Sequence, residues 1–182
     1  MRPFLIVGSA VALLFVAVFF GHLVHWGTDP GGWASAKWGM SVEQVRASMP
    51  GSLMLPASAE QQVCPDYGTK GSGVLGLVAS GVRLAGSVWT VCFFFEPSGK
   101  HGLVAVRLLS EVAPLAACVH LQTTFVDAFG GPYVVGNNSN DPTVDRPLVW
   151  MYPSSLVAVH RVLISPEEMV GRVILIYTRT GV

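Results

Sequence analysis

The sequence predicts an α+β domain, an antiparallel sheet with two packed helices, which follows one N-terminal transmembrane helix. Three observations lead to this prediction. Residues 4–24 contain no Asp, Glu, Lys or Arg. Residues 87–96 read SVWTVCFFFE, a run of aromatic and β-branched residues that is typical of a strand. Residues 114–129 place apolar side chains at helical spacing, namely Leu115, Cys118, Leu121, Phe125 and Phe129.

The uncharged N-terminal run is long enough to cross a bilayer, for which about 20 residues suffice. Arg2 precedes the run, and Asp29 is the first charged residue after it. The positive-inside rule then places the N-terminus in the cytoplasm and the domain in the periplasm or outside the cell. A cleaved signal peptide is the alternative, but the run ends in bulky residues rather than in the small residues of a cleavage site. We therefore expect a single-pass membrane protein anchored by residues 1–26.

Composition limits the classes of partner. Apolar residues make up 51% of the 182 residues and charged residues 12%, whereas about 25% charged residues is usual. The 11 basic and 11 acidic residues cancel, and this balance argues against nucleic-acid binding because there is no excess positive charge to neutralise phosphates. The low charge favours a domain whose surface is partly covered by a protein partner or a bilayer.

The first half of the predicted chain begins with a Gly- and Trp-rich linker at residues 27–37. Ser41 and Gln44 then form the S-x-x-Q pattern of a capping box, which predicts a short helix. A long polar loop is expected at residues 53–73. The aromatic run and residues 103–109 are separated by turn residues, so they predict a β-hairpin.

The second half repeats the order of a helix and then strands. The helix at residues 114–129 begins at a proline and ends before Gly130. After a polar loop, three more strands are predicted, at residues 148–152, 156–164 and 172–178. This order predicts a single domain at residues 38–182, and it also fits a duplicated α-then-β unit.

Short motifs resemble those of bacterial envelope proteins. Residues 38–41 read WGMS and, with Val45, resemble the helix opening of the SmpA/OmlA-type outer-membrane assembly lipoproteins. Residues 129–132, with Trp150 and Tyr152, resemble their G-x-P … W-x-Y segment. The duplicated layout is similar to the β-lactamase inhibitor protein fold. The chain departs from the lipoprotein pattern because no cysteine closely follows the apolar run. The resemblance implies a protein-binding or assembly role in the cell envelope.

Two patterns in the sequence could indicate a cofactor site or a metal site. Gly71, Gly73 and Gly76 form G-x-G-x-x-G, but a dinucleotide site needs a strand before these glycines and a helix after them. Residues 137–141 offer side-chain oxygens to calcium but lack the regular spacing of a calcium loop. We therefore expect no cofactor and no metal ion.

The three cysteines allow one disulfide in an oxidising compartment. Cys64 lies in the long loop and Cys118 on the apolar stripe of the second helix, so a Cys64–Cys118 bridge is slightly preferred, with three reduced thiols as the alternative. Cys118 and His120 are two residues apart on a helix, so they point to different faces and cannot meet as nucleophile and base. A tertiary pair of Cys92 with His120 or His160 stays open, although for His160 a satisfied sheet histidine is the default.

These observations predict a non-catalytic, membrane-anchored interaction module, as an accessory subunit or assembly factor of an envelope complex. Trp33 and Trp38 are the candidate partner contacts, with interfacial anchoring and ordinary core packing as the alternative. The second hypothesis is a small-ligand or lipid-binding domain, with a pocket between the second helix and the sheet. A hydrolase is the third, and it requires a Cys–His or Asp–His pair in an open cleft.

Overall fold

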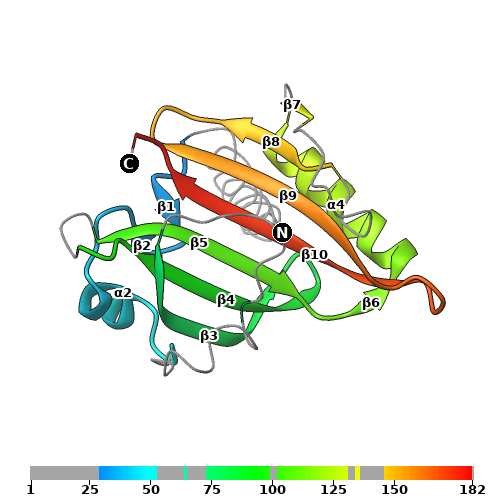
Figure 1. Cartoon of the computed structure of the whole chain (residues 1–182), viewed down its shortest axis with the longest axis horizontal. Coiled ribbons are helices and arrows are strands. Elements are labelled where there is room, and N and C mark those ends of the chain that lie inside the picture. The colour runs from blue at the N-terminus through cyan, green and yellow to red at the C-terminus, as the bar shows by residue number, and fades with distance from the viewer. Residues whose placement is uncertain are drawn as a thin grey trace, which may run out of the picture.

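The computed structural model describes residues 29–52, 64, 73–98, 102–130, 134–135 and 146–181. They form one broad antiparallel sheet, a small N-terminal hairpin and two helices (Figure 1). The helices are α2 (Val42–Ser48) and α4 (Leu115–Phe129). The strands are, in chain order, β1 (Gly32–Trp33), β2 (Ala36–Lys37), β3 (Val74–Leu84), β4 (Ser87–Phe95), β5 (Leu103–Ser110), β6 (Ala113–Pro114), β7 (Val134–Val135), β8 (Leu148–Met151), β9 (Ser155–Ser165) and β10 (Val170–Arg179).

Two meanders meet at the centre of the sheet. β3, β4 and β5 pair in chain order, β7 to β10 pair in chain order, and β5 pairs with β10. Val106 of β5 lies opposite Tyr177 of β10, and Leu108 lies opposite Leu175. Because β5 has a neighbouring strand on each side, its residues can be apolar on both faces. All eight residues of β5 are buried.

One face of the sheet, called here the first face, carries the main core. α4 packs over β9 and β10 on this face and buries the apolar stripe that the helical spacing predicts. The ring of Phe125 meets Trp89 of β4 edge-on, with 5.6 Å between ring centroids. Phe129 lies 5.1 Å from Trp150 of β8 by the same measure. Aromatic packing therefore links α4 to both halves of the sheet.

The second face of the sheet is also buried. Alternation along β4 turns Cys92 and Phe94 to this face, where they pack with Leu109 of β5. A separate cluster on β9 and β10 consists of Ala158, Val162, Ile174 and Ile176. β4 is covered on both sides, because residues 91–95 are all buried.

The N-terminal residues of the described chain are folded onto the sheet, although they were predicted as part of a linker. Asp29 accepts hydrogen bonds from the hydroxyl groups of Ser155 at 2.7 Å and Ser154 at 2.9 Å. Burial raises the pKa of Asp29, but these hydrogen bonds, together with those from the backbone of Ser154 and Gly31, outweigh it and hold the pKa below its usual value. The chain is thereby fixed to the β8–β9 turn from residue 29 onward.

α2 has the predicted capping box: the Ser41 hydroxyl accepts from the Gln44 backbone at 3.3 Å, and the Gln44 side chain accepts from the Ser41 backbone at 2.8 Å. Both halves have the predicted order of a helix and then strands, but the helices differ, because α2 has only 7 residues and contacts β2 and the edge strand β3. α4 has 15 residues and lies over β9 and β10. The two helices therefore do not hold equivalent positions on the sheet.

The prediction of an N-terminal transmembrane helix is also corrected. No helix within the described residues is both long and apolar enough to cross a membrane. This contradicts the predicted transmembrane helix and the single-pass, periplasmic or extracellular location that depended on it. Residues 4–24, on which the prediction was made, lie outside the described residues. The part of the chain that is described is dominated by the antiparallel sheet.

Candidate functional site

The two tryptophans predicted as partner contacts make contacts within the domain. Trp33 lies 6.1 Å from Phe93 between ring centroids. Trp38 donates a hydrogen bond from Nε1 to the Ser155 hydroxyl at 2.9 Å. Both side chains are partly buried against the main core. Their contacts therefore match the core-packing alternative.

The disulfide joins Cys64 to Cys92, with 6.5 Å between their Cα atoms, so the predicted Cys64–Cys118 bridge is wrong. The sheet explains the difference: Cys92 and Cys64 cluster on the second face, whereas Cys118 projects from α4 into the first-face core. Cys118 is a buried free thiol. Burial raises the pKa of Cys118, and a protonated thiol is a poor nucleophile.

His160 lies on the second face, in β9, and is only 8% exposed. Its Nδ1 has no hydrogen-bond partner among the described residues. Burial and, to a smaller extent, the positive charge of Arg107 lower the pKa of His160 to about 4. The imidazole is therefore neutral near pH 7. Cys92 cannot act with it as a nucleophile, because the Cys92 sulfur is in the disulfide.

The buried imidazole predicts a loss of stability in mild acid. In the unfolded chain, a histidine gains its proton near its ordinary pKa of about 6.5, whereas folded His160 resists protonation until about pH 4. The unfolded state thus binds more protons between these values, and lowering the pH from about 7.5 to about 5 costs about 2 kcal/mol. The charged groups near His160 on neighbouring strands are Arg107 of β5 and Arg172 of β10.

Urea unfolding at both pH values checks this expectation. A His160→Leu variant serves as the control, because leucine suits the apolar neighbours and does not titrate. The free energy of unfolding of the wild type should fall by about 2 kcal/mol more than that of the variant. An equal fall in the two proteins would contradict this expectation, because it would show that the pKa of His160 is not lowered in the folded protein.

A cavity of about 230 Å³ lies beside the first turns of α4. Its polar lining comes from Ser87, Ser110, Glu111 and His120, and its apolar lining includes Cys118 and Leu121. Its position, between the helix and the end of the sheet, is where the small-ligand hypothesis placed a pocket. The described residues include no group of three or more His, Cys, Asp or Glu side chains that could hold a metal ion.

The glycine pattern is explained by packing. Gly73 immediately precedes β3, and Gly76 lies within it. A strand, and not a helix, therefore follows the first of these glycines. A Cβ atom on Gly76 would lie 2.6 Å from the ring of Phe95, so only glycine fits beneath this ring without a shift. Gly71 and the loop at residues 137–141 lie outside the described residues.

Exposed apolar side chains gather where the β9–β10 hairpin meets the start of α4. Val112, Val119, Ile164 and Met169 are between 42% and 55% exposed. Two contacts bring their segments together: Leu115 at the start of α4 donates its backbone N–H to the Met169 carbonyl at 2.8 Å, and β6 pairs with β10. We call these four residues, together with the glutamates described next, the hairpin-end surface.

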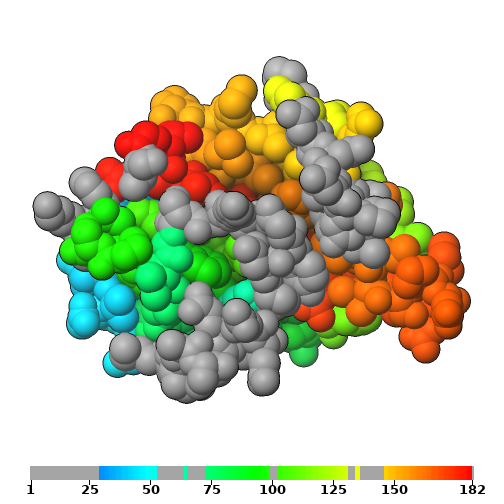
Figure 2. Space-filling view, in the orientation of Figure 1, coloured from blue at the N-terminus to red at the C-terminus, as the bar shows by residue number. Residues whose placement is uncertain are grey.

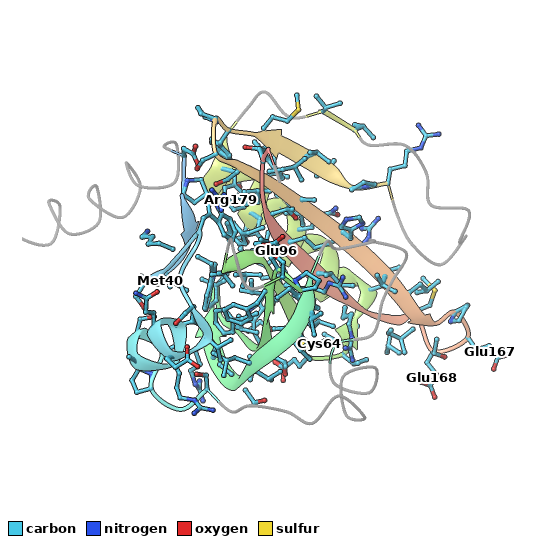
Figure 3. All side chains as sticks on the ribbon, turned by 60° about the vertical axis from the view of Figure 1, so that its left-hand side comes forward. Met40, Cys64, Glu96, Glu167, Glu168 and Arg179 are labelled. Atoms are coloured by element: carbon cyan, nitrogen blue, oxygen red, sulfur yellow. A yellow bond between two sulfur atoms is a disulfide. The ribbon has the colours of Figure 1, made fainter. Side chains whose placement is uncertain are left out.

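The exposed charges on the connection after β5 and in the β9–β10 turn are negative. Glu111, Glu167 and Glu168 are exposed. Figure 3 shows Glu167 and Glu168 at the tip of the hairpin, pointing away from the body of the protein, and in Figure 2 the same tip protrudes at the right. Within residues 111–120 and 161–172, the exposed side chains that carry a full charge are all glutamates, because Arg161 and Arg172 are partly buried.

The hairpin turn holds Met169 in an unfavourable backbone conformation. Its φ of +53° lies in the left-handed region, which costs a non-glycine residue about 1–2 kcal/mol. The turn is closed by the Met169 N–H, which donates to the Pro166 carbonyl at 3.3 Å. Glycine would satisfy this turn better, so the fold gives no reason for a large exposed side chain here. Strain at an exposed position supports a functional role for the side chain.

A second group of exposed apolar residues lies at the edge of the sheet formed by β7 and β8. It consists of Val134 and Val135 of β7 and Met151 of β8, which is 73% exposed. The sheet order places β7 and β8 beside β9, at the far edge from β3. No glutamate or aspartate lies in the described residues of β7 and β8, so this edge lacks the charge of the hairpin-end surface.

Comparison with known proteins found no matching family model, no matching curated protein and no matching solved structure. The resemblance to SmpA/OmlA-type proteins and β-lactamase inhibitor proteins therefore stays a prediction.

Proposed function

We propose that this protein is a non-catalytic protein-binding module whose partner docks on the hairpin-end surface. The observation that carries the proposal is Met169, which is exposed and is held in a strained backbone conformation where the hairpin turn meets the start of α4. Methionine is common at adaptable binding surfaces, because its side chain is flexible and polarizable. Contiguous apolar groups with a polar rim often mark protein interfaces.

The shape of this surface favours a protein over a small molecule. The hairpin tip protrudes from the body (Figure 2), whereas small ligands are held in concave sites. Val119 and Met169 belong to different elements, a helix and a turn, that the Leu115 hydrogen bond fixes together. Such a surface offers contact area without enclosure, which suits a partner that supplies its own complementary surface.

Exchange of one exposed methionine tests the proposal. Met169→Ser should weaken partner binding about tenfold or more, as loss of an apolar anchor does at interfaces. Met151→Ser is the matched control, because Met151 is at least as exposed but lies on the other edge of the sheet. Binding to the co-purified partner, measured by biolayer interferometry, should be unchanged by the control. Equal effects of the two substitutions would contradict the proposed site.

A small-ligand site beside α4 is the second candidate function, because the 230 Å³ cavity lies there. Ala117 lines this cavity from the helix, so Ala117→Trp should fill it while leaving the hairpin turn intact. Native mass spectrometry of the purified protein checks for a bound small molecule. A ligand that is present in the wild type and lost in the variant would support this candidate, and an unliganded wild type would count against it.

A further inference from the structure

We propose that the partner segment seated on the hairpin-end surface is cationic, with Lys or Arg side chains on either side of an apolar anchor. This inference rests on the proposed function and adds the chemistry of the partner to it. The anchor contacts Met169 and Val119, and the basic side chains meet the glutamates at the rim. Ordering of the charges around the apolar group, rather than within it, leaves the apolar contact dry.

The glutamates adjoin two of the apolar residues along the chain. Glu111 ends the connection from β5 and adjoins Val112, while Glu167 and Glu168 adjoin Met169 in the hairpin turn. The Glu168 backbone N–H donates to the Ser165 hydroxyl at 3.3 Å, which holds the turn that presents both side chains. A partner with acidic residues here would meet like charge on two sides of its anchor.

The arginines of the β9–β10 hairpin are less exposed than its glutamates. Arg161 is partly buried on the first face, close enough to Cys118 to influence the thiol electrostatically. Arg172 is partly buried, and its Nε atom is inaccessible to solvent. The N-terminus of α4 contributes about half a positive charge, and the Met169 carbonyl already accepts from its Leu115 N–H. Three exposed carboxylates exceed that contribution.

Two synthetic peptides of equal length test the charge of the partner. One consists of Leu and Lys, and the other replaces every Lys with Glu. Each is labelled with a fluorophore and titrated with the full chain, with binding followed by fluorescence anisotropy at low and at physiological salt. The Leu–Lys peptide should bind at least tenfold tighter than the Leu–Glu peptide, and the difference should shrink as salt rises.

Variants separate this inference from the proposed function. The double variant Glu167→Gln, Glu168→Gln should weaken Leu–Lys binding several-fold and reduce its salt dependence. Asp127→Asn is the matched control, since Asp127 is exposed at the other end of α4. Met169→Ser should weaken binding of the peptide at either salt concentration.

The outcomes are distinguishable. If the Leu–Lys peptide does not bind, the cationic inference is overturned. If both peptides bind equally and Met169→Ser weakens both, the cationic inference is overturned but the binding site itself is supported. If Leu–Lys binding ignores Met169→Ser but responds equally to the Glu167, Glu168 and Asp127 substitutions, it is unspecific charge attraction. That last result would overturn the inference and remove support for the proposed site as well.

Discussion

Replacement of Phe125 by alanine is expected to lower the free energy of unfolding by about 3–5 kcal/mol, the usual range for a fully buried phenylalanine. Phe125 is 0% exposed. Its ring contacts Trp89 on β4 and stacks on Phe129 one turn further along α4, at 6.1 Å between centroids. The substitution therefore opens a void where the helix meets both halves of the sheet, and neighbouring aromatic rings are too rigid to fill it.

Val119→Ala on the same helix is the matched control. Val119 is 42% exposed, so its truncation should change the free energy of unfolding by less than about 0.5 kcal/mol. Urea unfolding followed by tryptophan fluorescence measures both variants. Similar losses in the two proteins would contradict the assignment of the Phe125 side of α4 to the core.

Removal of the Cys64–Cys92 disulfide is expected to cost about 3–4 kcal/mol. The bridge closes a loop of sequence separation 28, and the chain-entropy relation gives a loss of this size for such a loop. Cys64→Ala measures it, because the other partner, Cys92, is fully buried in the sheet and is left in place as a thiol.

Reduction of the wild type provides the control for this prediction. Dithiothreitol should lower the free energy of unfolding of the wild type to the level of Cys64→Ala and leave the variant unchanged. The remaining thiol, Cys118, is buried in both proteins. A wild type whose stability does not respond to the reductant would show that the bridge does not form in solution.

Local sequence patterns predicted the elements whose signals are strong. The apolar stripe of α4 and the capping box of α2 are both present in the structure. The strand at residues 87–96 was found because aromatic and β-branched residues fill it. β3 was missed because its glycines look like breaks in a strand, whereas register shifts between Leu75 and Leu77 and between Ala79 and Val82 accommodate them within the pairing.

Features that depend on the side of the sheet could not be predicted from the sequence. The Cys64–Cys92 bridge and the burial of Cys118 follow from which face of the sheet each cysteine occupies, and sequence spacing does not contain that information. Trp33 and Trp38 were assigned to a partner because of their position in the chain. In the fold, the N-terminal segment returns to the sheet, so Trp33 reaches Phe93 and Trp38 reaches Ser155.

The hairpin-end surface was also invisible in the sequence. Its members come from the connection after β5, from α4 and from the β9–β10 turn, and only the fold brings them together. Residues 166–169 form the hairpin turn that presents Glu167, Glu168 and Met169. The one local signal was a methionine beside two glutamates, in a segment where a turn would ordinarily use glycine.

Site-specific photo-crosslinking tests whether a protein partner docks on the hairpin-end surface. A photoreactive phenylalanine analogue is placed at position 169 in one full-length protein and at position 151 in another, and each is irradiated in the cells that produce the protein naturally. We expect one discrete crosslinked protein from position 169, competed away by unlabelled wild type but not by Met169→Ser, and none from position 151. Crosslinking of the same protein from position 151, or none from position 169, would contradict it.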